Sequence, residues 1–181
     1  MVMRQLKEFT IQFVGLKLGK HSFDYNINKA FFEDFEYEEF NDASVDVQVV
    51  LNKKTTLMEL HFNAKGCVNV NCDLTNESYD QPIENNFDVV VKFGETFNDE
   101  NEDILILPHG EYELNIAQYI YELIALAVPT KRIHPGVLNG TLNSDILDKL
   151  EELSPKMNDQ KRQDQEIDPR WNTLKKLLTD K

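Results

Sequence analysis

Apolar residues recur at every second position over a long central part of the chain, and this pattern constrains the fold most. An alternation with a period of two places one set of side chains on a single face of an extended strand. The turn at Lys53 and Lys54 separates the first two stretches, and a polar stretch from residue 73 precedes the third. The alternating positions are Val45, Val47, Val49 and Leu51, then Met58, Leu60, Phe62, Ala64, Val68, Val70 and Cys72, then Phe87, Val89, Val91 and Phe93. They predict a meander of antiparallel strands.

Two further segments extend the predicted sheet. Phe9, Ile11 and Phe13 alternate as a half-buried strand, and the glycine-containing residues 15–27 supply a turn and a return strand. Residues 103–108, "DILILP", form another apolar run. We therefore expect six or seven strands within residues 9–108, arranged as an antiparallel sheet or a small barrel.

The apolar period changes near residue 115. The stripe of a helix packed on a sheet follows, made by Ile116, Ile120, Leu123, Ile124 and Ala127. Asn115 is a candidate N-cap with Gln118 three residues later, and Pro129 disfavours helical geometry at Val128. A helix over residues 115–128 is predicted, and the fold class is α+β. A shorter helix is predicted after Asn28, a second candidate cap.

The C-terminal third predicts a different organisation. A short helix follows Asn143 or Ser144, either of which can cap it, and we expect a single domain over residues 1–153. Residues 154–167 have little to bury and predict a flexible linker. In residues 168–181, Asp168 and Pro169 begin an amphipathic helix or tail whose apolar edge includes Trp171. That tail either covers the sheet as a lid or inserts into a partner.

Charge is distributed unevenly. The net charge is −13, and between Asp80 and Glu113 ten acidic residues face a single base, Lys92. Residues 33–46 contain no base, whereas residues 129–181 are nearly neutral. The acidic body favours a basic protein partner over bare nucleic acid, although an acidic excess can also serve solubility alone. With neither a long apolar segment nor a secretory signal pattern, we expect a cytoplasmic protein with no membrane contact.

The chemistry-bearing residues do not form a recognised catalytic or metal motif. Cys67 and Cys72 fall on opposite faces if they share a strand, so neither a disulfide nor a shared metal is expected. The glycines form no phosphate-binding loop, and no nucleophile signature accompanies the four histidines. We therefore expect no enzyme activity, no cofactor, no metal and no small-molecule substrate. His109 is placed in an exposed turn, and His134 either holds a turn by a hydrogen bond or acts in binding.

Three motifs follow one another along the chain: "CDLTNESY" at 72–79, "ELNIAQYIYELIALAVP…H" at 113–134, and "DPRWNTLKKL" at 168–177. In this order and spacing they resemble the YceD family of large ribosomal RNA subunit accumulation proteins. The resemblance implies a bacterial, non-enzymatic factor needed for accumulation of large-subunit ribosomal RNA. In this family the gene commonly neighbours that of a small zinc-binding protein of the large subunit.

The resemblance also implies which positions matter. The family's Cys-Asp-Arg-Cys pattern falls on Cys72, Asp73, Leu74 and Thr75, so its second cysteine is a threonine here, which puts a thiol or metal role in doubt. The remaining positions carried over are Glu113, Leu114, Glu122, Pro129, His134, Asp168, Pro169, Arg170 and Trp171.

The sequence is compatible with two binding mechanisms and with one alternative class of protein. The protein could shelter a basic ribosomal protein on its acidic sheet, or contact a large-subunit precursor and its RNA through basic residues. The candidate partner-binding residues are Lys131, Arg132, His134, Arg170 and Trp171. Net charge favours the first mechanism. A small hydrolase built on His134 and a cysteine is the alternative class, and a large distance between those groups would exclude it.

Overall fold

The computed structural model describes residues 7–101, 103–142 and 145–153. The described residues up to 142 belong to one compact unit, and helix α4 (Asp145–Leu153) belongs to a second. The predicted caps Asn143 and Ser144, the predicted linker at 154–167 and the predicted tail at 168–181 lie outside the described residues. None of the described helices is long and apolar enough to cross a membrane.

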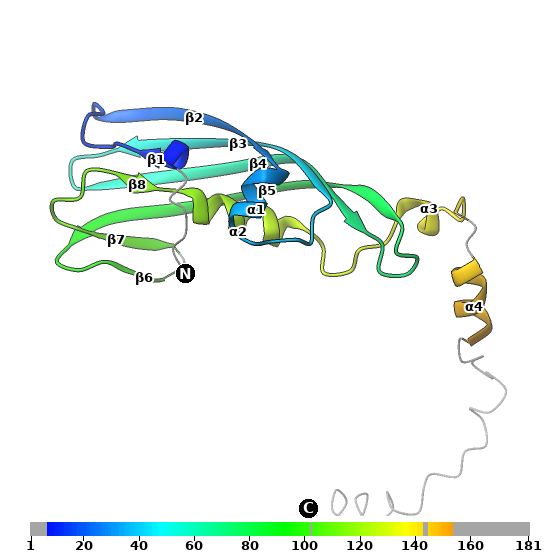
Figure 1. The fold of residues 1–181 in the computed structure, drawn as a ribbon. Helices are drawn as coiled ribbons and strands as arrows, with labels where there is room; N and C mark the ends of the chain where they lie inside the picture. Colours follow the sequence, from blue (N-terminus) through cyan, green and yellow to red (C-terminus); the bar gives the residue numbers. More distant parts are fainter. Residues whose placement is uncertain (1–6, 102, 143–144, 154–181) are drawn as a thin grey trace, which may run out of the picture. The chain divides into compact units, whose positions relative to one another are not determined.

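A six-stranded sheet forms most of the first unit (Figure 1). Its strand order is β2-β3-β4-β5-β7-β6. The strands are β2 (Gly19–Asn28), β3 (Asp42–Lys53), β4 (Leu57–Asn71), β5 (Ser78–Gly94), β6 (Asn98–Asn101) and β7 (Ile104–Pro108). The meander predicted from the alternation is confirmed in β3, β4 and β5, which pair antiparallel along most of their length.

The sheet is open and mixed, so the fully antiparallel sheet and the closed barrel are both wrong in detail. Strand β7 pairs parallel to β5 and antiparallel to β6. The chain leaves β5 at Gly94, runs along the sheet edge as β6 and returns as β7 between the two. Gly94 permits this close approach, because a Cβ there would lie 2.7 Å from Ile106 Cγ2. The α+β class stands, without crossover helices between the parallel strands.

The N-terminal strand does not form the predicted hairpin. Strand β1 (Thr10–Ile11) pairs with β8 (Leu114–Asn115) in a separate two-stranded sheet. The following loop is held to the main sheet by Lys53 instead. The Lys53 ammonium donates to the carbonyl oxygens of Phe13 at 2.8 Å and Leu16 at 2.9 Å. Residues 15–19, which predict a tight turn between paired strands, therefore belong to a loop that hydrogen bonds from the distant Lys53 hold in place.

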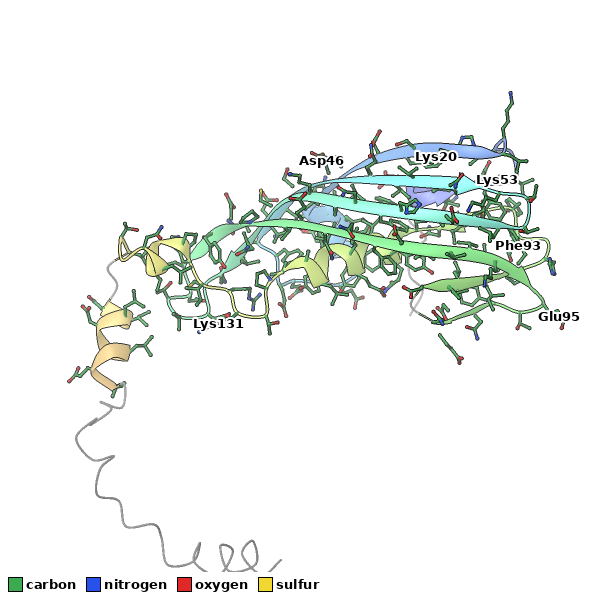
Figure 2. All side chains as sticks on the ribbon, turned by 180° about the vertical axis from the view of Figure 1, so that it is seen from behind. Lys20, Asp46, Lys53, Phe93, Glu95 and Lys131 are labelled. Carbon is green, nitrogen blue, oxygen red and sulfur yellow. The ribbon has the colours of Figure 1, made fainter. Side chains whose placement is uncertain are left out.

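The two faces of the main sheet differ in chemistry. The inner face carries the alternating apolar side chains and is covered by α1 (Lys29–Asp34) and α2 (Ala117–Ala127) (Figure 1). The outer face is polar, and its side chains pair across strands. Examples are Asn26 with Asp46 and Asn69 with Asp80. Figure 2 views the molecule from the opposite side to Figure 1 and labels Lys20 on the edge strand β2 and Asp46 on the neighbouring strand β3.

Helix α2 follows the predicted stripe and ends where Pro129 requires. Ile116, Ile120, Leu123 and Ile124 are buried, and Val128 is extended just before the proline. Asn115 accepts a hydrogen bond from Ala117 N–H at 3.0 Å, although Ile116 holds the N-cap position. Gln118, three residues after Asn115, donates from its side-chain amide to Glu122 Oε1 at 2.7 Å. Asn28 caps α1 as predicted.

Short helical turns complete the described residues. A 3-10 turn, η1 (Lys7–Phe9), precedes β1, and α3 (Pro135–Leu138) follows the exit from α2. His109 lies in an exposed turn after β7, as predicted, beside Gly110 with its positive φ of 108°.

Candidate functional site

The turn after α2 packs against the loop after β4, and we call this contact the junction (residues 72–75 with 130–136). The two segments exchange hydrogen bonds. Asp73 N–H donates to the Arg132 carbonyl at 2.8 Å, and Arg132 N–H donates to Asp73 Oδ2 at 2.7 Å. Segments almost sixty residues apart in the sequence are thereby fixed to each other.

The Arg132 side chain forms ion pairs with two carboxylates at the junction. Its guanidinium lies 3.1 Å from Glu39 Oε2 through Nη1 and 3.5 Å from Asp73 Oδ1 through Nε. The side chain is 27% exposed. Two carboxylates therefore neutralise a cation that the sequence placed on a presented surface. Lys131, its neighbour, is exposed and labelled in Figure 2.

Cys72 is buried at the centre of the junction. Its sulfur accepts a hydrogen bond from His134 N–H at 3.3 Å. Burial raises the pKa of the Cys72 thiol, but hydrogen bonds from the Thr75 side chain and from nearby backbone N–H groups more than offset this effect. The net result is a pKa below the ordinary value. Thr75, which replaces the family's second cysteine, thus contacts the Cys72 sulfur directly.

His134 caps a helix. Its Nδ1 accepts a hydrogen bond from Gly136 N–H at 2.9 Å at the start of α3, and its ring contacts Tyr79 edge-on at 5.3 Å between centroids. Gly136 has no room for a side chain, because a Cβ there would lie 2.9 Å from His134 Nδ1. The structural interpretation of His134, a hydrogen bond that holds the turn, therefore accounts for its position.

The structure brings Cys72, Asp73, Arg132 and His134 together, and separates the other positions from them. Leu114 is buried in β8, Glu113 is half-buried beside it, and Glu122 is exposed on α2. Arg170 and Trp171, with Asp168 and Pro169, lie outside the described residues.

The part of the chain that the structure describes contains no group of three or more His, Cys, Asp or Glu side chains that could hold a metal ion. Cys67 and Cys72 are both free thiols. Cys67 is half-buried in β4, and Cys72 is buried and follows the last residue of that strand.

A second candidate site, which the sequence did not indicate to us, is a groove beside α2. It has a volume of about 480 Å³ and lies between α2 and the strands at the β6 end of the sheet. We call it the acidic groove. Its floor is apolar and aromatic, and includes Phe87, Val89, Leu105 and Tyr119. Its rim carries the exposed apolar side chains Phe97 and Leu126 and the carboxylates Asp99 and Glu122.

Two signals in the sequence could have indicated this groove. Phe97 stands alone among polar residues in "ETFNDENED", where a large apolar side chain has no neighbour with which to alternate. Leu126 falls outside the buried stripe of its helix. Both are exposed large hydrophobic residues, at 56% and 80% respectively. Such residues together at the rim of a hollow are more informative than either one alone.

Fold and sites together define an α+β protein with an open sheet, a structural junction around Cys72 and His134, and an acidic groove. A family model described as large ribosomal RNA subunit accumulation protein YceD matches residues 60–178. The chain belongs to the YceD family. That description connects the chain with accumulation of large-subunit ribosomal RNA. No curated protein and no solved structure matches the chain significantly.

Proposed function

We propose that the chain is a non-enzymatic ribosome-biogenesis factor that binds a basic ribosomal protein before or during assembly of the large subunit. Its acidic surface is the observation that carries this proposal. Within the described residues, the segment from Glu95 to Glu113 contains acids and no lysine or arginine. Ribosomal proteins that contact RNA need a surplus of positive charge, and an acidic partner complements that charge.

Binding to a large-subunit precursor through its RNA is the alternative mechanism, and the geometry of the turn bears on it. Contact with phosphate needs available cations. Arg132 is paired with Asp73 and Glu39, which leaves Lys131 as the exposed cation of the described turn. Because few cations of the turn are available for phosphate, we favour contact with a protein over direct contact with RNA. Arg170 and Trp171 remain proposed partner-binding residues.

Catalysis by a cysteine and a histidine is the remaining class. Distance does not remove it, because Cys72 and His134 are in contact. Their hydrogen bonds count against it. The contact to the sulfur comes from the backbone N–H of His134, while the imidazole Nδ1 accepts from Gly136. A general base must reach the proton that it removes, so these bonds favour a structural pair.

The test is affinity capture of large-subunit components from a lysate of the source organism, with and without ribonuclease. We expect a basic large-subunit protein to be retained after ribonuclease treatment. Loss of every ribosomal component on digestion would contradict protein binding and support the RNA mechanism. Cys72→Ser provides the control for catalysis, since it should capture the same proteins.

A further inference from the structure

The acidic groove combines an aromatic floor with exposed apolar side chains at its rim. Its floor is built by rings, with Phe87 and Tyr119 stacked at 6.3 Å and Phe62 packed against both. Phe97 and Leu126 stand exposed at the rim. When a partner's apolar side chain covers apolar surface beside a hollow, both surfaces leave water and the complex is stabilised.

The electrostatics of the groove select the sign of that partner. Asp99 and Glu122 line it, and the described lining residues include no lysine, arginine or histidine. The pKa of the Tyr119 hydroxyl is raised above its ordinary value. Burial is the largest cause, and the negative charges of Asp99 and Glu122 add to it. An anionic rim around an apolar floor repels acidic segments and attracts cationic ones.

We propose that the acidic groove binds a cationic protein segment by its large apolar side chains, with lysine or arginine residues paired to Asp99 and Glu122. The segment's apolar residues would cover Phe97 and Leu126 and reach the aromatic floor. This inference deepens the proposed function, on which it rests, by assigning the binding surface and the chemistry of the segment bound. The outer face of the sheet is the contrasting surface, because a lysine lies beside a carboxylate there, Lys65 with Glu84 at 3.4 Å, whereas the described lining of the groove includes no basic residue.

The probe is a fluorescein-labelled synthetic peptide with two leucines and one phenylalanine among lysines, measured by fluorescence anisotropy with the full-length protein. The groove variant is Asp99→Lys/Glu122→Lys, and the matched control is Asp46→Lys/Glu84→Lys, which makes the same charge change on the outer face. Leu126→Ser tests the apolar part. A second peptide with serine in place of the apolar residues tests whether charge alone suffices.

We expect the groove variant to weaken binding of the apolar-cationic peptide by about tenfold or more, and the outer-face control to change it by less than about threefold. The serine peptide should bind far more weakly, and Leu126→Ser should reduce affinity for the first peptide alone. Equal losses in the groove and outer-face variants would overturn the assignment, because they would indicate a general effect of net charge. Thermal melts of each variant establish that it is folded.

The chain's own residues 170–178 contain an arginine, two lysines, a tryptophan and leucines, which makes them the rival occupant. Trp171→Ala distinguishes the two. A partner site predicts unchanged peptide affinity in this variant, whereas tighter peptide binding would mean that the tail competes for the groove, and would overturn the proposal. If the peptide binds the groove but no ribosomal protein is captured, the proposed function fails and the groove assignment stands. If ribosomal protein is captured equally by the groove variant, the groove assignment fails alone.

Discussion

Helix α2 borders two regions that use their charged groups in opposite ways. At the junction after its C-terminal end, Arg132 meets Asp73 and Glu39, and the Cys72 sulfur accepts hydrogen bonds. Along its side, the acidic groove exposes Phe97 and Leu126 between Asp99 and Glu122. Paired polar groups fix a geometry, and exposed apolar groups next to uncompensated charge attract a partner.

This difference changes which family positions we connect with binding. Three positions that the resemblance marks, Cys72, Asp73 and His134, lie in the junction and make hydrogen bonds within the chain there. The lining of the groove contains two other family positions, Leu114 and Glu122. A motif can therefore mark the residues that hold a surface in place rather than the surface itself.

The largest expected effect concerns the helix that connects the two regions. Ile124→Ala should destabilise the protein by about 2–5 kcal/mol, because the side chain is fully buried and its loss leaves a cavity. Leu126→Ala, two residues away and 80% exposed, should change the free energy of unfolding by less than about 0.5 kcal/mol. Urea denaturation measures both. Similar values would contradict the division of α2 into a packed side and a groove side.

The junction is tested by Asp73→Ala. The carboxylate accepts from Arg132 N–H and faces the guanidinium, both in partly exposed positions, so we expect a loss of about 1–2 kcal/mol. Asp73→Asn should recover part of this loss, since its amide oxygen can still accept the backbone hydrogen bond. Glu84→Ala, which removes an exposed pair with Lys65, is the control and should cause no measurable change. Equal stability of the Asp73→Ala and Glu84→Ala variants would mean that the junction does not stabilise the fold.

The third prediction concerns the Cys72 thiol, followed by its thiolate absorbance in a Cys67→Ser background. Thr75→Val removes a hydrogen bond to the sulfur and should move the titration midpoint to higher pH. The native pKa lies below the ordinary value of 9.0, so the stability linked to this group is present above pH 9 and is lost as the pH falls through the native pKa. In Thr75→Val that rise in stability should shrink. An unchanged midpoint would show that Thr75 does not stabilise the thiolate.

The smallest expected effect on stability is at the groove rim. Glu122→Gln keeps the hydrogen bond from Gln118 possible while it removes a charge from an exposed side chain, so the melting temperature should not change measurably. Binding of a cationic peptide should weaken slightly and become less sensitive to salt. A clear loss of stability would instead place Glu122 among the structural residues of the fold.

Local patterns predicted the central part of the fold well, because alternation and helical periodicity report directly which face is buried. Strands β3 and β4 and helix α2 follow from Val45, Leu60 and Ile120 and their repeats. Pairing between distant segments was not predictable in this way. The parallel return of β7, the pairing of Thr10 with Asn115 and the polar first half of β5 depend on partners far along the chain.

The candidate site was predicted in part for the same reason. The sequence singled out His134 and Arg132, but it did not place Glu39 and Asp73 beside the arginine, so a neutralised cation was interpreted as a presented one. The groove is lined by residues of β5, β6, β7, β8 and α2, which have no common motif, among them Phe87, Leu105 and Tyr119. Only the packed structure brings these segments together.

Capture of basic large-subunit proteins after ribonuclease treatment, compared between three full-length proteins, tests the central claim most directly. The three are the wild type, the groove variant Asp99→Lys/Glu122→Lys and the outer-face variant Asp46→Lys/Glu84→Lys. The account predicts that the wild type and the outer-face variant retain the same ribosomal protein and that the groove variant loses it. Retention by the groove variant at the wild-type level, or loss from the wild type on ribonuclease treatment, would contradict it.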